Sequence, residues 1–247
     1  MIIGMGTIIN VLSILAGAAL GVIVGHRLSE RTSRVVTDGL GLVVLVLGAM
    51  NVISITNPEL VAAVGSGIPL LIVIGAILIG GIIGSWLQIE ERLERLGAKL
   101  QERFSKAEGS DAKEKFITGF VNASLVFSIG PMAILGALSD GLGQGIEQLA
   151  LKSTLDGFAS LAFAASLGWG VALSAIPVGL WQGLLTAIAF MVGSVVATPL
   201  IAALTATGGI LLLGVGLRLL QIGMVQVGNM LPALIVAPLL TMLVMSF

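Results

Sequence analysis

The sequence predicts an all-α membrane protein, a polytopic bundle of seven or eight transmembrane helices. Hydrophobic residues make up 57% of the 247 residues and charged residues only 10%, whereas a soluble domain carries about 25% charged residues. Apolar segments of about 20 residues recur along the chain, and a helix of that length crosses a hydrocarbon layer of about 30 Å. The charges are too few to cover a water-facing surface, so the bilayer is the expected surrounding.

Eight apolar segments are expected to span the membrane. They lie near residues 5–25, 35–56, 68–88, 117–138, 153–174, 178–197, 208–224 and 230–246. The first segment lacks the basic start of a cleavable signal and stays apolar for longer than a signal core of about 7 to 15 residues, so we expect it to be retained. Residues 198–207 are apolar enough to extend the sixth span or to form a short re-entrant piece, which leaves seven spans as the alternative.

The positions of lysine and arginine predict the orientation of these spans. Of the twelve basic residues, three lie in residues 26–34 and seven in residues 88–115, and both connections fall on the same side of the membrane. Connections rich in basic residues stay in the cytoplasm, so the N-terminus is expected outside. The net charge of −1 gives no reason to expect nucleic acid as a partner.

The polar segment 88–115 is expected to form a cytoplasmic amphipathic helix or loop attached to a single transmembrane domain, residues 1–247. Its apolar residues recur every three or four positions and therefore share one helix face: Ile89, Leu93, Leu96, Leu100 and Phe104. That face suits packing on the protein itself, and it also suits a partner helix or the membrane surface. The segment is the basis of an alternative function, a non-transporting scaffold or regulatory protein.

An internal repeat is suggested between the first three and the last three helices. A shift of 168 residues places Gly41 and Gly48 on Gly209 and Gly216 without a gap. Five helices separate the starts of the two units, and because that number is odd the units would have opposite orientation. Inverted repeats are typical of secondary transporters, whose site lies near the midplane between the halves. Chance matching in a Gly- and Leu-rich chain is the alternative.

The fourth span concentrates polar residues and a helix breaker. Asn122, Ser124 and Ser128 precede the pair Gly130 and Pro131. Proline cannot donate a backbone hydrogen bond and its ring clashes with the preceding turn, so the helix should kink or break there. A broken helix presents free backbone groups that bind ions at membrane depth, and a simple proline kink is the alternative.

Charged residues mark the fifth and seventh expected spans. Lys152 and Asp156 are four residues apart and share a helix face, with Ser153 beside them. Ionisable groups at membrane depth are costly and are therefore candidates for function. We expect Asp156 to be a coupling carboxylate or cation ligand, while Lys152 lies near the edge of the span. Arg218 could neutralise Asp156, bind an anionic substrate or reach the cytoplasmic headgroups.

Four amides are further candidates, either to line a path or to bond between helices: Gln182, Gln221, Gln226 and Asn229. Enzyme motifs are missing, since there is no H-E-x-x-H, no G-x-S-x-G and no P-loop. A single histidine and no cysteine exclude a metal site built from those ligands. We therefore expect no enzymatic activity, no cofactor and no bound metal.

Three segments carry a resemblance to a known family. They are SIGPMAILGALSDG from Ser128, LKSTLDGFAS from Leu151 and SAIPVGLWQG from Ser174, and they resemble signature segments of the YqgA/YdfK-like bacterial membrane proteins, a family of unknown function. The resemblance covers the whole chain and implies a multi-pass protein of the bacterial inner membrane. The positions that match are Gly130, Pro131, Met132, Leu135, Gly136, Asp140, Gly141, Lys152, Ser153, Asp156 and Gly157.

The function expected from these residues is that of a transporter or channel for a small solute or ion. Asp140 joins the binding candidates through the resemblance, and the remaining candidates come from the residues themselves. The expected partners are the lipid bilayer and an unidentified small solute or ion. A homo-oligomer is also compatible with the composition.

Overall fold

The computed structural model describes residues 2–25, 29–104, 110–129, 131–192 and 197–246, and within these ranges the regular structure is helical, with no strand. The helices are α1 (Met5–Gly25), α2 (Glu30–Val52), η1 (Ile53–Thr56), α3 (Pro58–Val64), α4 (Ile68–Trp86), α5 (Ile89–Phe104), α6 (Ser110–Ile129), α7 (Pro131–Gly141), α8 (Glu147–Leu167), α9 (Gly170–Leu173), α10 (Ala175–Val192), α11 (Thr198–Leu219), α12 (Val227–Met230) and α13 (Ala233–Met245).

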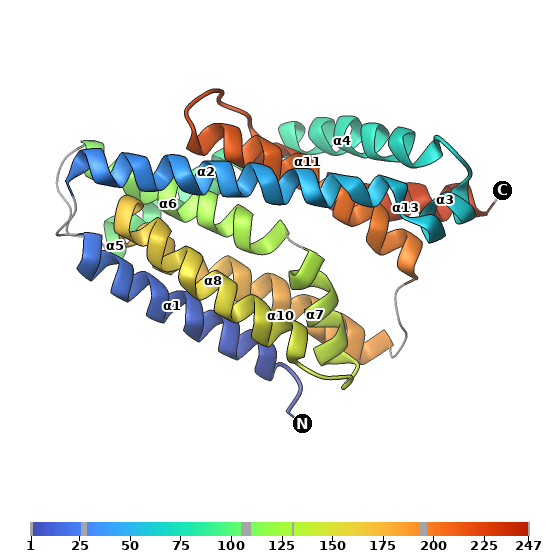
Figure 1. The fold of residues 1–247 in the computed structure, drawn as a ribbon, viewed down its shortest axis with the longest axis horizontal. Helices are drawn as coiled ribbons and strands as arrows, with labels where there is room; N and C mark the ends of the chain where they lie inside the picture. Colours follow the sequence, from blue (N-terminus) through green and yellow to red (C-terminus); the bar gives the residue numbers. More distant parts are fainter. Residues whose placement is uncertain (1, 26–28, 105–109, 130, 193–196, 247) are drawn as a thin grey trace. The chain divides into compact units, whose positions relative to one another are not determined.

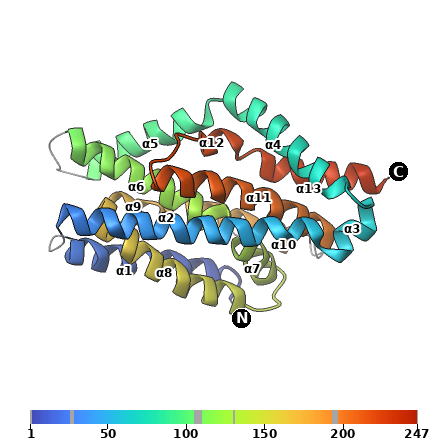
Figure 2. The ribbon, with the colours of Figure 1, turned by 45° about the horizontal axis from the view of Figure 1, so that its top comes forward.

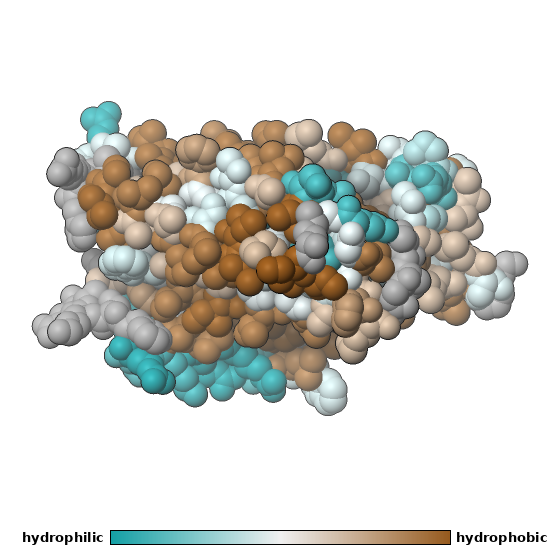
Figure 3. Space-filling model, turned by 90° about the horizontal axis from the view of Figure 1, so that it is seen from below, coloured by the Kyte–Doolittle hydropathy of each residue, from teal (hydrophilic) through white to brown (hydrophobic). Residues whose placement is uncertain are grey.

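Six helical segments of the described chain are long and apolar enough to cross a membrane: Met5–Gly25, Arg34–Thr56, Ile68–Trp86, Gly170–Met191, Thr198–Leu219 and Val227–Met245. The pair α6 and α7, whose axes meet at 61°, makes a seventh if it counts as one span. On the face seen in Figure 3, most of the coloured side chains are brown, that is, hydrophobic. An all-α, multi-pass membrane fold is thereby confirmed.

Two expected boundaries are wrong. Residues 198–207 neither extend the sixth span nor form a re-entrant piece, because they are the first half of α11. Ala197 is extended, and Pro199 in the first turn begins a new helix. The expected fifth span, 153–174, is interrupted, because α8 ends at Leu167 and Gly168 turns the chain with a φ of 77°. Glycine adopts that left-handed conformation without strain.

The chain forms two compact units. The first comprises residues 1–40, 93–128 and 132–195, and the second comprises residues 41–92, 129–131 and 196–247. In the first unit, α1 and α8 lie side by side along their length (Figures 1 and 2). Gly17, Gly21 and Gly25 of α1 leave no room for a Cβ against the backbone of α8. Small residues at this spacing allow close packing in lipid, where no hydrophobic effect drives association.

The second unit is built on α4, α11 and α13, with α2 from Gly41 onward. A Cβ atom at Gly48 would lie 2.9 Å from the carbonyl oxygen of Gly209, and a Cβ at Gly209 would lie 2.7 Å from that of Gly48. A Cβ at Gly216 would lie 3.1 Å from the carbonyl oxygen of Gly41. Because Gly41 approaches Gly216 while Gly48 approaches Gly209, α2 and α11 run antiparallel.

The contacts between α2 and α11 are reciprocal under the sequence shift of 168 residues. Two glycines on each helix take part: each lies against a side chain of the other helix, and the residues 168 positions away make the same contact with the roles of the two helices exchanged. The paired contacts are Gly48 with Leu213 and Gly216 with Leu45, then Gly41 with Leu220 and Gly209 with Val52. An exchange of roles of this kind is the pattern of an interface around a two-fold axis.

The expected polar segment contains α5, residues 105–109, which lie outside the described chain, and the start of α6. The apolar stripe of α5 is partly covered by α6, because a Cβ at Gly97 would lie 3.0 Å from the ring of Phe120. Leu96 on the same helix is 42% exposed. The helix therefore packs on its own chain over part of its apolar face.

Candidate functional site

A buried polar cluster of the first unit surrounds Asp156 on α8. Asp156 and Lys152, 7% and 5% exposed, form a salt bridge one helical turn apart. The ammonium group of Lys152 also lies 5.9 Å from the ring centroid of Phe127 on α6, in reach of a cation–π interaction. Spacing of four residues predicted that the two charges share a face, and their pairing is observed.

Asn10 of α1 joins this pair to a third helix. Its Nδ2 atom donates to Oδ2 of Asp156 at 3.0 Å and to Oε1 of Gln182, on α10, at 3.2 Å. Asn10 and Gln182 are fully buried. Three helices of the first unit, α1, α8 and α10, therefore converge on one polar cluster, consisting of Asn10, Lys152, Asp156 and Gln182.

Several buried polar atoms beside this cluster have no hydrogen-bond partner within the described residues. Four of them lie on facing positions of α1 and α10: Thr7 Oγ1, Asn10 Oδ1, Gln182 Nε2 and Thr186 Oγ1. Native structures pair almost all buried polar groups, and an exception calls for an explanation such as bound water or a ligand. Each group left without a partner costs about 1–3 kcal/mol.

These polar atoms continue to a cavity at the N-terminal end of α1. The cavity has a volume of about 470 Å³ and is lined by residues of α1, of α10 and of the chain just before α1. Thr7 and Thr186 are among the lining residues. Thr7 lies one turn from Asn10, and Thr186 lies one turn from Gln182, so the cavity and the charged cluster are neighbours along the same two helices.

Asp140, at the end of α7, holds the start of α1. Its side chain is 2% exposed, and its two carboxylate oxygens accept hydrogen bonds from the backbone amides of Gly4 and Gly6, both at 3.0 Å. A carboxylate at a helix N-terminus pairs with free amides and with the positive end of the helix dipole. The geometry gives this residue an anchoring role.

Two of the three expected serine ligands, Ser124 and Ser153, are engaged by their own helices. Ser124 donates to the carbonyl of Phe120 and Ser153 to that of Leu149, each at 2.6 Å. Hydroxyl groups in helices often make such bonds one turn back. Ser128 is half-buried. Asn122 is 1% exposed, and its Oδ1 atom lacks a partner within the described chain.

The predicted break in the fourth span falls between α6 and α7. Gly130 lies outside the described residues, and so does the side chain of Pro131, the first residue of α7. The described helices on either side differ in direction by 61°, which agrees with the kink expected at a proline.

Arg218 belongs to the second unit, near the end of α11. Its guanidinium group forms a salt bridge with Glu90, in the first turn of α5. The same carboxylate accepts a hydrogen bond from the amide of Gly228, and the amide of Glu90 donates to Oδ1 of Asn229 at 2.9 Å. Glu90 therefore ties the end of α11 to the start of α12.

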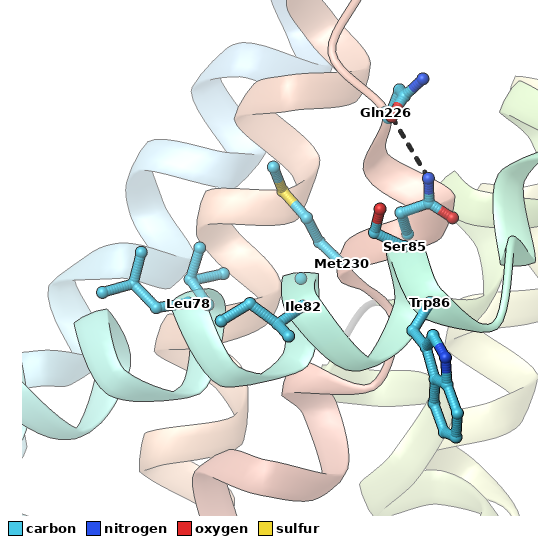
Figure 4. A pocket seen from close by; sticks show the side chains of 9 residues that line it. Leu78, Ile82, Ser85, Trp86, Gln226 and Met230 are labelled. Carbon is cyan, nitrogen blue, oxygen red and sulfur yellow. Dashed lines mark hydrogen bonds between the residues drawn. The ribbon is translucent and has the colours of Figure 1, made fainter.

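A second cavity, of about 630 Å³, lies in the second unit along α4 (Figure 4). Its lining is largely apolar, with Leu78, Ile82 and Trp86 on α4. Its amides are bonded to each other, since Nδ2 of Asn229 donates to Oε1 of Gln226 at 3.2 Å. Because these polar groups have partners, this cavity is a weaker candidate than the one beside Thr7.

Sequence reasoning missed Asn10 and Glu90. Asn10 is an isolated amide within a long apolar span, and a polar residue in that position is itself a signal for a partner inside the bundle. Glu90 was hidden among the many charges of the polar segment. Nothing in the spacing separates it from Glu91, and only the folded chain shows that it is buried.

The comparisons with known proteins agree on one family. The family described as "Protein of unknown function (DUF554)" matches residues 5–242. The chain is 33% identical over 232 residues to "Uncharacterized protein YqgA" of Escherichia coli (strain K12), covering 94% of each chain. It is 30% identical over 242 residues to "Uncharacterized membrane protein YdfK" of Bacillus subtilis (strain 168), covering 98% of this chain and 97% of that protein. No solved structure matches.

Proposed function

This chain belongs to the family described as protein of unknown function DUF554, and we propose that it is a transporter or channel that moves a small solute or ion across the membrane. The observation that carries the proposal is the buried pair of Asp156 and Lys152 at the meeting point of three helices. Asp156 would bind the solute or ion. Lys152 would be the charge partner of Asp156, and the bound solute or ion would displace it.

The energetics of the pair support a functional role. Burying two charges costs more than an apolar pair of similar size, and replacement of buried ion pairs by apolar residues is often neutral or stabilising. Packing alone therefore gives little reason to keep Lys152 and Asp156. Charged residues inside a membrane bundle commonly mark the path of a substrate or ion, and the polar atoms on α1 and α10 add neutral ligands next to Asp156.

We further infer that the helices before α5 and those after α9 form an inverted repeat. The reciprocal contacts between α2 and α11 support it, and so does their antiparallel packing. In the first unit, Val11 of α1 touches Gly179 of α10, and these two residues are also 168 apart. Inverted repeats are characteristic of secondary transporters, in which one repeat rocks against the other.

We place the protein in the bacterial cytoplasmic membrane with its N-terminus outside. The support is the concentration of basic residues in the two connections that would then be cytoplasmic. The alternative function, a scaffold acting through α5, has less support, because α6 covers part of the apolar face that a partner would need.

The test is electrical and isotopic flux measurement on proteoliposomes containing the purified chain, challenged with a panel of ions, amino acids and organic acids. We expect one class of solute to move with the wild-type chain and to stop moving with Asp156→Asn. Glu90→Gln is the matched control, since it also removes a buried, paired carboxylate but in the other unit. Flux that is equally lost in both variants, or unaffected in both, would contradict the role of Asp156.

A further inference from the structure

The facing surfaces of α1 and α10 form a seam that is polar at one end and apolar at the other. Thr7 and Thr186 line the cavity, and Asn10 and Gln182 follow one turn deeper, where Asn10 reaches Asp156. One residue beyond Asn10 the helices close, because a Cβ at Gly179 would lie 2.9 Å from Cγ2 of Val11. Within the described chain the seam therefore leads to Asp156 from the N-terminal end of α1 only.

The chemistry along the seam indicates what it holds. The Thr7 and Thr186 hydroxyls both donate and accept, Asn10 offers an acceptor oxygen, and Gln182 offers donor hydrogens. The residues that carry these four atoms are each more than nine-tenths buried. The atoms themselves have no hydrogen-bond partner in the described chain. A dehydrated metal cation binds oxygen atoms and is repelled by an amide NH₂. Water satisfies donors and acceptors alike, and typically makes two to four such bonds when buried.

We propose that this seam is a water-filled route that delivers protons from the N-terminal side of the membrane to the carboxylate of Asp156. The proposal deepens the proposed function, on which its transport part rests, by naming the proton as the ion that reaches the site. In the step itself, a hydrated proton transfers to the carboxylate of Asp156, leaving water and a neutral carboxylic acid. The salt bridge to Lys152 is lost in that step.

The surroundings of Asp156 fit a carboxylate that gains and loses a proton. Lys152, one turn away, is the charged group that contacts it. The groups facing it from α1 and α10 are the neutral amides Asn10 and Gln182, and α6 contributes the ring of Phe127 beside Lys152. Asp140, the other acid of this unit that is buried among the described residues, is held by backbone amides at the start of α1.

Water access to the seam can be measured separately from transport, by the reactivity of single introduced cysteines. The method suits this chain because its own sequence has no cysteine. Thr7→Cys and Thr186→Cys should react with a membrane-impermeant thiol reagent applied from the N-terminal side. Two control positions are buried as Thr7 and Thr186 are. Ala18→Cys lies on α1 beyond the point where Val11 approaches Gly179, and Thr207→Cys replaces a hydroxyl that bonds within α11. We expect both seam thiols to react at least roughly ten times faster than either control, because only a hydrated thiol ionises to the reactive thiolate.

Proton delivery is tested with a pH-sensitive dye inside proteoliposomes after an external acid pulse. Thr7→Val combined with Thr186→Val should slow proton entry several-fold, whereas Thr207→Val should not. Asp156→Asn should abolish proton entry while leaving the Thr7→Cys reaction unchanged. Seam thiols as unreactive as the controls would overturn the route even if solute flux persists. If the seam thiols react but no flux is measured, the water-filled route stands and the proposed transport function is rejected. Proton entry indifferent to both threonine hydroxyls would overturn proton delivery.

Discussion

Asn10 and Asp156 are joined by a hydrogen bond of 3.0 Å that links α1 to α8. The same Nδ2 group also reaches Gln182, so one amide holds two helices to α1. The Asn10 side chain therefore contributes both to helix packing in the first unit and to the surroundings of the charged pair Lys152 and Asp156.

Replacing Asn10 by leucine should impair both packing and activity. The variant removes the donor to Asp156 and to Gln182, and leaves these buried acceptors with fewer partners, at a cost of about 1–3 kcal/mol. Thermal unfolding in detergent measures the loss, and proteoliposome flux measures the effect on activity. Ser13→Ala is the control, because it removes a bond between the same two helices, from Ser13 to the carbonyl of Ser153, without touching Asp156.

The paired charges should separate stability from activity in a double-mutant cycle. Asp156→Asn leaves the ammonium of Lys152 buried without a charge partner, and Lys152→Met does the same to the carboxylate, so each should lower stability by about 3–5 kcal/mol. The double variant should recover most of that stability, because neither charge remains. We expect its flux to stay lost. Recovery of flux in the double variant would make the pair purely structural.

Asp140→Ala should loosen the start of α1. Two backbone amides lose a charged acceptor, and each hydrogen bond to a charged group contributes about 1.5–3 kcal/mol. Hydrogen exchange of the Gly4 and Gly6 amides should accelerate more than exchange in the middle of α1. Asp140→Asn retains one carbonyl oxygen and should give an intermediate effect. Unchanged exchange in both variants would remove Asp140 from its anchoring role.

Two glycines on one helix provide a matched test of close packing in the second unit. A Cβ at Gly84 would overlap the carbonyl oxygen of Asn229, while a Cβ at Gly81 meets nothing within 4 Å. Gly84→Ala should therefore destabilise the chain, by about 1–3 kcal/mol for an overpacked site. Gly81→Ala should be neutral or slightly stabilising, since alanine favours the helix. Thermal unfolding of the two variants, measured side by side, decides the point.

The fold class and the charged pair were accessible from the sequence because each depends on local properties. Apolar length predicts a span, and a four-residue spacing predicts that Lys152 and Asp156 meet on one helix. The start of α11 was not accessible, since the whole region is apolar and its described markers are the extended Ala197 and Pro199 in the first turn. Partners across the bundle, such as Asn10 for Asp156, depend on how helices pack, which no single span reveals.

The orientation of the helices makes a prediction that also tests the inverted repeat. A reporter fused within residues 105–110 should be cytoplasmic, and one within residues 57–64 external. The reason is that basic residues gather in residues 88–115, the connection that contains the cytoplasmic fusion site.

Cysteine labelling tests the antiparallel arrangement of α2 and α11. Since these two helices run antiparallel, a residue that follows α2 and a residue that precedes α11 should face the same side of the membrane. Cysteines placed at Asn57 and Ala197 should therefore both react with an impermeant reagent supplied from outside, whereas a cysteine at Gly223, just beyond α11, should react only after the membrane is opened. Labelling of Asn57 and Ala197 from opposite sides would reject the antiparallel pair, and with it the repeat. Labelling of both from the cytoplasmic side would keep the repeat but invert the proposed orientation of the whole chain.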